Sequence, residues 1–306
     1  MKKQTLYIIF GVVVFTLACT LGNGTPAAPT QAQDDQVSTV VAATIQALIA
    51  QTPGAAPGEV LPSEAAPTQA PAQTNGIPVS LEYASFVIST GLATGATPES
   101  VPAVGEENGG PWDVAPAHLK FTLTGYLLQN KFHTPVIYVF PANEYAAVNP
   151  GAADQIKRTA VAVEGGPLQR ETFPTIPFFN AGPLFDAGMQ HMKFQSGTGV
   201  RELTQYAQYS APVNNREMFY HFEGLSSDYK YYIIAILPIT APVLQEDENP
   251  QTPIPSGGVP FPADGMADQS YYNSVTEKLN ALPPDSYTPS LSALDLLIES
   301  ILVTNP

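Results

Sequence analysis

Four consecutive segments in the second half of the chain share the composition of β-strands, with alternating apolar positions and many aromatic and β-branched residues. They are residues 188–195, 200–207, 216–223 and 230–238. Short connections rich in Gly, Asn, Ser and Asp join them, and these residue types favour hairpin turns. The pattern predicts an antiparallel meander.

The last two of these segments differ in how their faces alternate. Residues 231–237 are apolar at both odd and even positions, so this strand should be central and covered on both sides. In the segment before it, Met218, Tyr220 and Phe222 make one apolar face. The opposite face carries His221 and Glu223, so we expect it to be wetter and to lie at the surface.

The flanking sequence predicts the elements around this meander. We expect strands at 79–90, 118–128 and 135–140, a loop at 91–116, and a polar, Ala-rich region from Pro141, broken at 149–151. A helix is expected at 152–163, followed by a Phe-rich connection at 165–186 that covers part of the core. An acidic, proline-rich loop should occupy 241–265.

Two helices are expected to close the chain, and the second has the more regular apolar stripe. Leu294, Leu297, Ile298, Ile301 and Leu302 follow helical spacing within 290–303, with Ser292 and Asp295 as a capping box. We expect this stripe to lie on the sheet of its own domain. The fold class is therefore α+β: a mostly antiparallel sheet with a four-strand meander and helices on both faces. This order of elements resembles the PsbP/Mog1-like sandwich, and the resemblance implies no site.

The first nineteen residues have the layout of a secretory signal. Lys2 and Lys3 precede fourteen uncharged, mostly apolar residues, and the run ends at Ala18-Cys19. This ending resembles the lipobox of bacterial lipoproteins, although Thr16 and Leu17 depart from its commonest form. The resemblance implies that 1–18 is cleaved and that Cys19, the only cysteine, carries lipid. The alternatives are an uncleaved membrane anchor, which normally needs about 20 apolar residues, and a plain signal peptide.

Residues 19–76 form a compositional block that predicts a disordered tether. Ala, Pro, Thr and Gln supply 35 of the 57 residues from 20 to 76, and this block has no aromatic or basic residue. A short helix at 37–48, transient or partner-docking, is the one element it could hold. The folded domain is then expected at 77–306.

The net charge of the chain and the absence of known catalytic motifs disfavour several classes of function. The chain has a net charge of −15, which disfavours binding to nucleic acid or to anionic lipid headgroups, so membrane attachment is expected through lipid alone. No sequence motif for a hydrolase, a metalloprotease or a nucleotide-binding loop is present, and Gly197-Thr198-Gly199 fits a hairpin turn.

Individual residues also give no catalytic, cofactor or metal site. The four histidines are His118, His133, His191 and His221, and only His221 can be placed beside another ligand-type residue, Glu223. Trp112 could stack on a ligand, but pinning its loop to the core is the favoured interpretation. We expect a lipid-anchored, extracytoplasmic binding or assembly protein with no cofactor and an unspecified protein or small-molecule partner. The alternative is a surface-tethered hydrolase whose site is assembled from residues distant in sequence.

Overall fold

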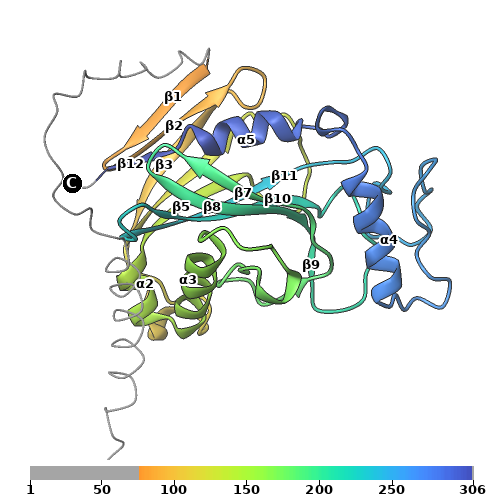
Figure 1. Cartoon of the computed structure of the whole chain (residues 1–306), viewed down its shortest axis with the longest axis horizontal. Helices are drawn as coiled ribbons and strands as arrows, with labels where there is room; N and C mark the ends of the chain where they lie inside the picture. Colours follow the sequence, from red (N-terminus) through yellow and green to blue (C-terminus); the bar gives the residue numbers. More distant parts are fainter. Residues whose placement is uncertain (1–75, 305–306) are drawn as a thin grey trace, which may run out of the picture.

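A computed structural model describes residues 76–304 of the chain (Figure 1). The expected signal peptide 1–18, Cys19 and the tether to residue 75 lie outside this range. Gly76, expected as the last tether residue, instead opens the first strand.

Seven strands make the main sheet, and every neighbouring pair is antiparallel. Their spatial order is β3 (Gly95–Val101), β4 (His118–Thr124), β5 (Val136–Pro141), β11 (Tyr231–Pro238), β10 (Phe219–Ser226), β8 (Gly197–Thr204) and β7 (Ala187–Phe194). The α+β class with a mostly antiparallel sheet is thereby confirmed.

The central strand is β11, with three strands on either side of it. Ile233, Ala235 and Leu237 belong to one hydrophobic core, whereas Ile234 and its even-numbered neighbours belong to a second core on the opposite face. A strand that is apolar on both faces must be covered on both, which explains its central position.

The first face is covered by the C-terminal segments and a small sheet (Figure 1). Helix α5 (Leu291–Glu299) lies on it beside a three-stranded sheet of β1 (Gly76–Leu81), β2 (Ala84–Ser89) and β12 (Leu302–Val303). Helix α4 (Gln269–Asn280), preceded by its N-cap Asp268, packs at the β7 end of the sheet. A 3-10 turn, η3 (Pro284–Ser286), connects the two helices.

The second face is covered by α2 (Ala142–Val148), α3 (Pro150–Ala162) and the connection 165–186 (Figure 1). Asn149 starts α3, because its Oδ1 accepts a hydrogen bond from the Ala152 N–H at 3.0 Å and Pro150 occupies the first turn. The connection contains η2 (Arg170–Thr172) and β6 (Gly182–Pro183), which pairs with β9 (Tyr206–Ala207). Its Ile176, Phe178 and Phe179 pack in the second core, which shows that it covers the sheet, as expected.

Two predictions for the N-terminal part of the domain are wrong. The single strand expected at 79–90 is a hairpin of β1 and β2, turned at Glu82, whose φ is +48°. No Gly or Asn signals that turn. The loop expected at 91–116 contains β3 and a 3-10 turn, η1 (Glu106–Asn108). Strand β3 was missed because it is an exposed edge strand carrying Pro98 and so lacks apolar alternation.

Around the helices, one region had no predicted element and one prediction is wrong. The Ala-rich region after Pro141 contains α2, with Tyr145 buried. The C-terminal helix ends at Glu299, and Leu302–Val303 instead pairs with β2. Its N-cap is Ser290, whose Oγ accepts from the Ala293 N–H at 3.2 Å, so Ser292 makes no capping box.

Asp295 does not cap α5, and its side chain instead attaches this helix to the sheet. Its Oδ1 lies 3.3 Å from Nε of the buried Arg201 on β8 and accepts a hydrogen bond from the Tyr220 hydroxyl at 2.8 Å. Arg201 also donates to the backbone carbonyl of Gly188. A buried cation with these acceptors fixes the helix over β8 and β10.

We predict that Leu297→Ala lowers the free energy of unfolding by about 2–5 kcal/mol, because the side chain is fully buried and its loss leaves a cavity. The matched control is Leu296→Ala, one residue away on α5 and 49% exposed, which should change it by less than about 0.5 kcal/mol. Urea denaturation followed by circular dichroism measures both. Equal losses would mean that α5 does not bury its stripe on this sheet.

Candidate functional site

Three ionisable side chains are buried together on the second face of the sheet. Strands β8 and β10 pair so that His221 lies directly opposite Glu202, and Glu223 follows two residues later on the same face. His221 and Glu223 are 0% exposed and Glu202 is 1% exposed. The expectation that His221 and Glu223 lie at the surface is therefore wrong, because α3 and the connection 165–186 cover this face.

His221 is held between two carboxyl groups. Its Nδ1 lies 3.0 Å from Glu202 Oε1, and its Nε2 lies 3.0 Å from Glu223 Oε1. A ring protonated at both nitrogens donates to both oxygens, and the raised pKa of His221 favours this imidazolium form at neutral pH. Burial alone lowers the pKa of His221, but the hydrogen bonds and charges of the two glutamates outweigh burial and raise it to about 9.

Glu223 is the inner end of this arrangement. Its Oε1 accepts from His221, and its Oε2 accepts from the Tyr232 hydroxyl. Thr159 of α3 places its Oγ1 3.1 Å from the same Oε2. Because both oxygens accept hydrogen bonds, Glu223 supplies the carboxylate that balances the imidazolium.

Glu202 is bonded differently, because its Oε2 has no donor among the described residues. Its carboxyl group lies near enough to Asp186 for each acid to affect the pKa of the other. Burial raises the pKa of Glu202 to about 8, and burial also raises the pKa of Asp186. The raised pKa keeps Glu202 protonated at neutral pH, so this buried carboxyl group adds no second negative charge beside Asp186.

Asp186 is the outer end of the series, which we call the buried acid–histidine chain: Asp186, Glu202, His221 and Glu223. Arg170 fixes Asp186 with its Nε, 3.2 Å from Asp186 Oδ2. Its Nη2 donates to the carbonyls of Pro183 and Leu184 at 2.9 and 3.1 Å. Arg170 thus links the connection 165–186 to Asp186, the outermost residue of the buried acid–histidine chain.

Aromatic rings seal the buried acid–histidine chain from water. The rings of Phe173 and Tyr206 each lie 6.3 Å from the His221 ring, centroid to centroid. Burial raises the pKa of Tyr206 well above its ordinary value, and the neighbouring glutamates add to this effect. The charges therefore interact in an apolar surrounding, where each hydrogen bond counts for more than in water.

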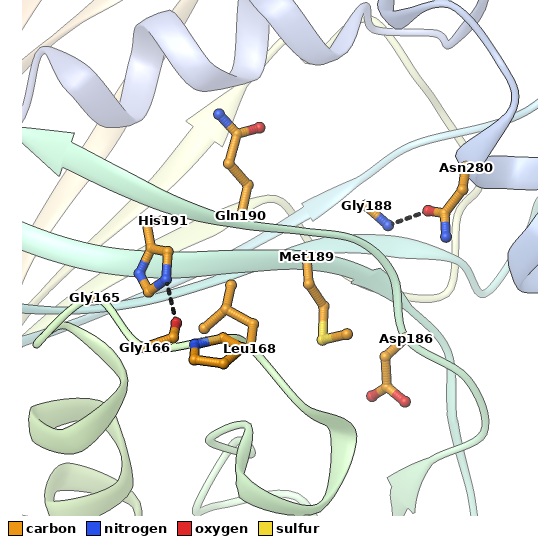
Figure 2. Close-up of a pocket in the computed structure, with 10 residues that line it drawn as sticks. Gly165, Gly166, Leu168, Asp186, Gly188, Met189, Gln190, His191 and Asn280 are labelled. Carbon is orange, nitrogen blue, oxygen red and sulfur yellow. Dashed lines mark hydrogen bonds between the residues drawn. The ribbon is translucent and has the colours of Figure 1, made fainter.

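Asp186 also lines a pocket that opens to solvent and has a volume of about 790 Å³ (Figure 2). The pocket lies between the edge strand β7 and the start of the connection 165–186. The lining residues are Gly165, Gly166, Pro167, Leu168, Asp186, Gly188, Met189, Gln190, His191 and Asn280. This volume falls in the range of small-molecule sites.

The pocket walls are held by two hydrogen bonds across them. His191 places Nε2 2.9 Å from the Gly166 carbonyl, and Asn280 accepts the Gly188 N–H at 2.6 Å (Figure 2). Gln190 turns away from the pocket and accepts from Arg201 on the other face. Asp186, Met189 and His191 therefore remain as the side chains of β7 and its approach that face the opening.

The other residues considered from the sequence do not join this site. His118 is buried, which lowers its pKa, and its Nδ1 lies 2.9 Å from the Pro116 carbonyl. Burial lowers the pKa of His133 to about 4, and its ring packs on Phe219. Trp112 is 43% exposed, so it does not pin its loop to the core.

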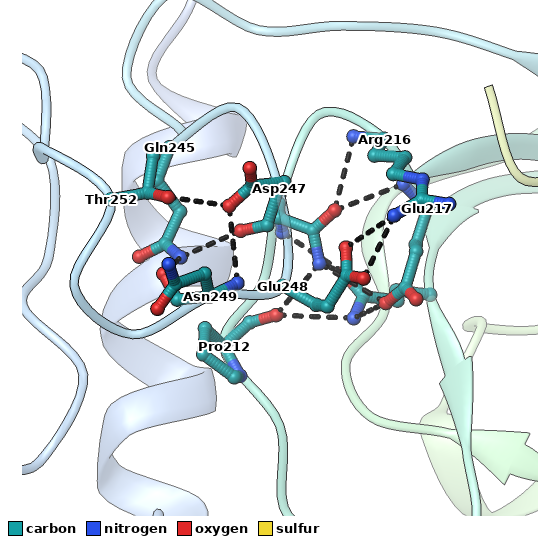
Figure 3. A network of polar contacts seen from close by, with 10 residues as sticks. Pro212, Arg216, Glu217, Gln245, Asp247, Glu248, Asn249 and Thr252 are labelled. Carbon is teal, nitrogen blue, oxygen red and sulfur yellow. Dashed lines mark hydrogen bonds and ion pairs between the residues drawn. The ribbon is translucent and has the colours of Figure 1, made fainter. Parts of the chain in front are cut away.

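A second network of polar side chains lies around the 212–217 turn, and its members bond to one another (Figure 3). The buried Gln205 donates to Glu217 Oε2 at 2.8 Å, and Arg216 pairs with Glu248 at 2.8 Å. The Thr252 hydroxyl donates to Asp247 and lowers the pKa of that acid. These polar groups bond one another, so the network anchors the acidic loop 241–265 to the meander.

Asp186, Glu202 and Arg170 were missed from the sequence. Glu202 sits inside a strand whose other residues from Gly199 onward are buried, and the Phe-rich cover over this face was foreseen. Together these two signals could have placed Glu202 and His221 inside. Nothing in the sequence indicates that Asp186 meets them.

Within residues 76–304, no three His, Cys, Asp or Glu side chains are grouped to hold a metal ion. No helix in the same range is long and apolar enough to span a bilayer. Comparison of the chain with protein-family models, curated proteins and solved structures finds no match.

We predict that the protein becomes less stable as pH rises from about 7 to 8.5. His221 and Glu202 both have raised pKa values, about 9 and about 8, in the folded state. Their protonated forms therefore stabilise the fold at low pH, and that contribution is lost as pH rises through these values. His118 and His133 have lowered values in the folded state, so their contribution to stability increases with pH mainly below this window and changes little within it.

The matched variant is Glu202→Gln, whose amide oxygen can accept from His221 and whose side chain is neutral, like the protonated acid, at every pH. Urea midpoints at the two ends of the window should fall less for this variant than for the wild type. Identical falls would show that Glu202 is already ionised at pH 7.

Proposed function

We propose that the protein is a lipid-anchored extracytoplasmic protein that binds a small molecule. Lipid on Cys19 would attach it to the membrane, and residues 20–75 would act as the tether of the folded domain. The basic start, the apolar run and Ala18-Cys19 support the anchor. A strongly acidic domain is consistent with attachment by lipid instead of by a basic surface.

The observation that carries the binding role is the pocket between β7 and the connection 165–186. It has the size of a ligand site, and its glycine-rich rim exposes backbone groups beside Leu168 and Met189. Its walls are held by two hydrogen bonds between protein groups. A preformed pocket spends little binding free energy on ordering its walls.

A surface-tethered hydrolase is the second candidate, and one observation favours it: Asp186 and His191 line the same pocket in front of a buried acid–histidine pair. The chemistry of the lining weighs against it. The ten lining residues include no Ser, Thr, Cys, Tyr or Lys to act as a nucleophile. His221 and Glu202 are too deeply buried to reach a substrate.

Cys19→Ala should abolish incorporation of radiolabelled palmitate and leave the precursor uncleaved, because the thiol is the only atom of the chain that can form the thioether. Metabolic labelling in a bacterial host measures this. Thr20→Ala, the adjacent substitution, serves as the control and should label normally. Undiminished labelling of the Cys19 variant would end the lipoprotein proposal without bearing on the pocket.

A further inference from the structure

We infer that the pocket takes a short extended peptide, which adds to the free edge of β7 as an antiparallel strand through backbone hydrogen bonds. This inference rests on the proposed binding function and names the ligand class and the way in which the ligand is held. Strand addition to a sheet edge is a general mode of peptide recognition: main-chain hydrogen bonds supply affinity, and pockets for alternate side chains supply specificity.

Strand β7 is the last strand of the main sheet, so its backbone pairs on one side only. The hairpin that joins it to β8 has a two-residue turn and is closed by Phe194 and Gly197. Such a closing pair exchanges both N–H···O=C bonds, and bonded and non-bonded pairs alternate from there along the strand. His191 and Lys193 lie in non-bonded pairs, so they direct their N–H and C=O groups away from β8.

These two residues leave four backbone groups open on the sheet edge. Among the described residues, no group hydrogen-bonds to the outward N–H or C=O of His191 or Lys193, and both residues are exposed. The start of β7 is different, because Gly188 donates to Asn280 and accepts from Arg201. The open edge therefore begins beyond Gly188, where β7 runs past the pocket.

The pocket provides space for a strand beside this edge. Met189 and His191 line it from β7, and Gly166 and Leu168 line it from the connection 165–186 (Figure 2). An added strand lies about 4.8 Å from its neighbour, and four extended residues span about 13 Å. A tetrapeptide is therefore long enough to pair with both His191 and Lys193, and the pocket volume of about 790 Å³ is in the range of small-ligand sites.

A peptide also matches the mixture of donors and acceptors around the pocket. The open edge presents N–H and C=O groups in turn, and a peptide backbone carries the complementary groups at the same spacing. Asn280 uses its Oδ1 for Gly188, and its Nδ2 donates to no described residue, so it can bind a peptide carbonyl. Asp186 is not needed as a ligand, because its side chain is 5% exposed and paired with Arg170.

The antiparallel direction determines which peptide side chains enter the pocket. In a bonded antiparallel pair, the two opposite side chains lie on the same face of the sheet. The His191 side chain points to the second face, where its Nε2 contacts the Gly166 carbonyl. Peptide residues that bond to β7 therefore place their side chains beside Leu168 and Met189, which are half-buried and apolar. These peptide residues should be apolar.

A second copy of the chain is a less suitable strand for this edge. The net charge of −15 makes two copies repel each other. The register shift between Ala187 and Gln190 and the exposed Lys193 are features that hinder edge-to-edge pairing of sheets. The connection across the pocket also leaves room for a short segment only. A free peptide avoids all three obstacles.

The test uses acetyl-Leu-Thr-Leu-Thr-amide as the probe and NMR of the full-length protein as the readout. The His191 and Lys193 amides should exchange rapidly in the free protein and about tenfold more slowly with the peptide at ten times its Kd. The Met192 amide, which bonds within the sheet, should be protected in both states. The Met189 methyl signal should shift with the peptide, and that of Met218, buried in the first core, should not.

Two N-methylated forms of the probe have the same side chains and differ only in backbone donors. Methylation of both Leu nitrogens removes the N–H groups that face β7 and should weaken binding by about tenfold or more. Methylation of both Thr nitrogens alters N–H groups that face away from β7 and should leave the affinity within about threefold.

Lys193→Pro tests the same bond from the side of the protein. The proline ring removes the outward N–H without breaking a bond to β8, and proline is tolerated at such edge positions. This variant should bind the probe about fivefold or more weakly. Lys193→Gln keeps the N–H and should bind within about twofold of the wild type. If the proline variant melts early by circular dichroism, the methylated probes decide the question.

The outcomes separate strand addition from the binding role. A Met189 shift without protection of the His191 and Lys193 amides, or equal affinity of the three peptides, would overturn strand addition and leave a small-molecule pocket. Loss of binding on Thr methylation alone would overturn the antiparallel direction. No response to the probe would overturn the peptide as ligand, and fragments of other classes would then test the binding role.

Protection of the two amides in the free protein would also overturn the inference. Protection that falls on dilution would show that a second copy covers the edge. Protection that is independent of concentration would show that another segment of the same chain does so.

Discussion

The structure depends on burying an imidazolium between two carboxyl groups on the second face of the sheet. Charges taken from water cost free energy unless hydrogen bonds compensate them. Here the partners come from three neighbouring strands: Glu202 from β8, His221 and Glu223 from β10, and Tyr232 from β11. The neighbouring strands, α3 and the connection 165–186 must therefore hold one arrangement, since a shift of any of them would leave a buried charge unpaired.

Two consecutive residues of β8 make polar contacts on opposite faces of the sheet. Arg201 points to the first face and holds Asp295 of α5, whereas Glu202 points to the second and holds His221. Strand geometry makes this division unavoidable, because neighbouring side chains emerge on opposite faces. Strand β8 therefore contacts α5, which covers the first core. It also contributes Glu202 to the buried acid–histidine chain, whose outermost residue, Asp186, lines the pocket.

The sequence predicted what depends on local apolar periodicity. The meander and the central position of 231–237 follow from alternating Ile and Tyr residues, and the buried Leu297 follows from helical spacing. Partnerships between distant polar residues were not predictable. The face of β10 that carries His221 looks wet by composition, and its burial depends on a Phe-rich cover and on acids contributed by other elements.

The central claim is that His221 is doubly protonated inside the fold, and ¹⁵N NMR of the histidine side chains tests it most directly. At pH 7.5 the account predicts imidazolium-type shifts for both ring nitrogens of His221, assigned by their loss in His221→Gln. His133, whose pKa is lowered to about 4 by burial, supplies a neutral ring for comparison in the same spectrum. A neutral tautomer at His221, with one unprotonated nitrogen, would contradict the account, because the proton order along the buried acid–histidine chain would then be wrong.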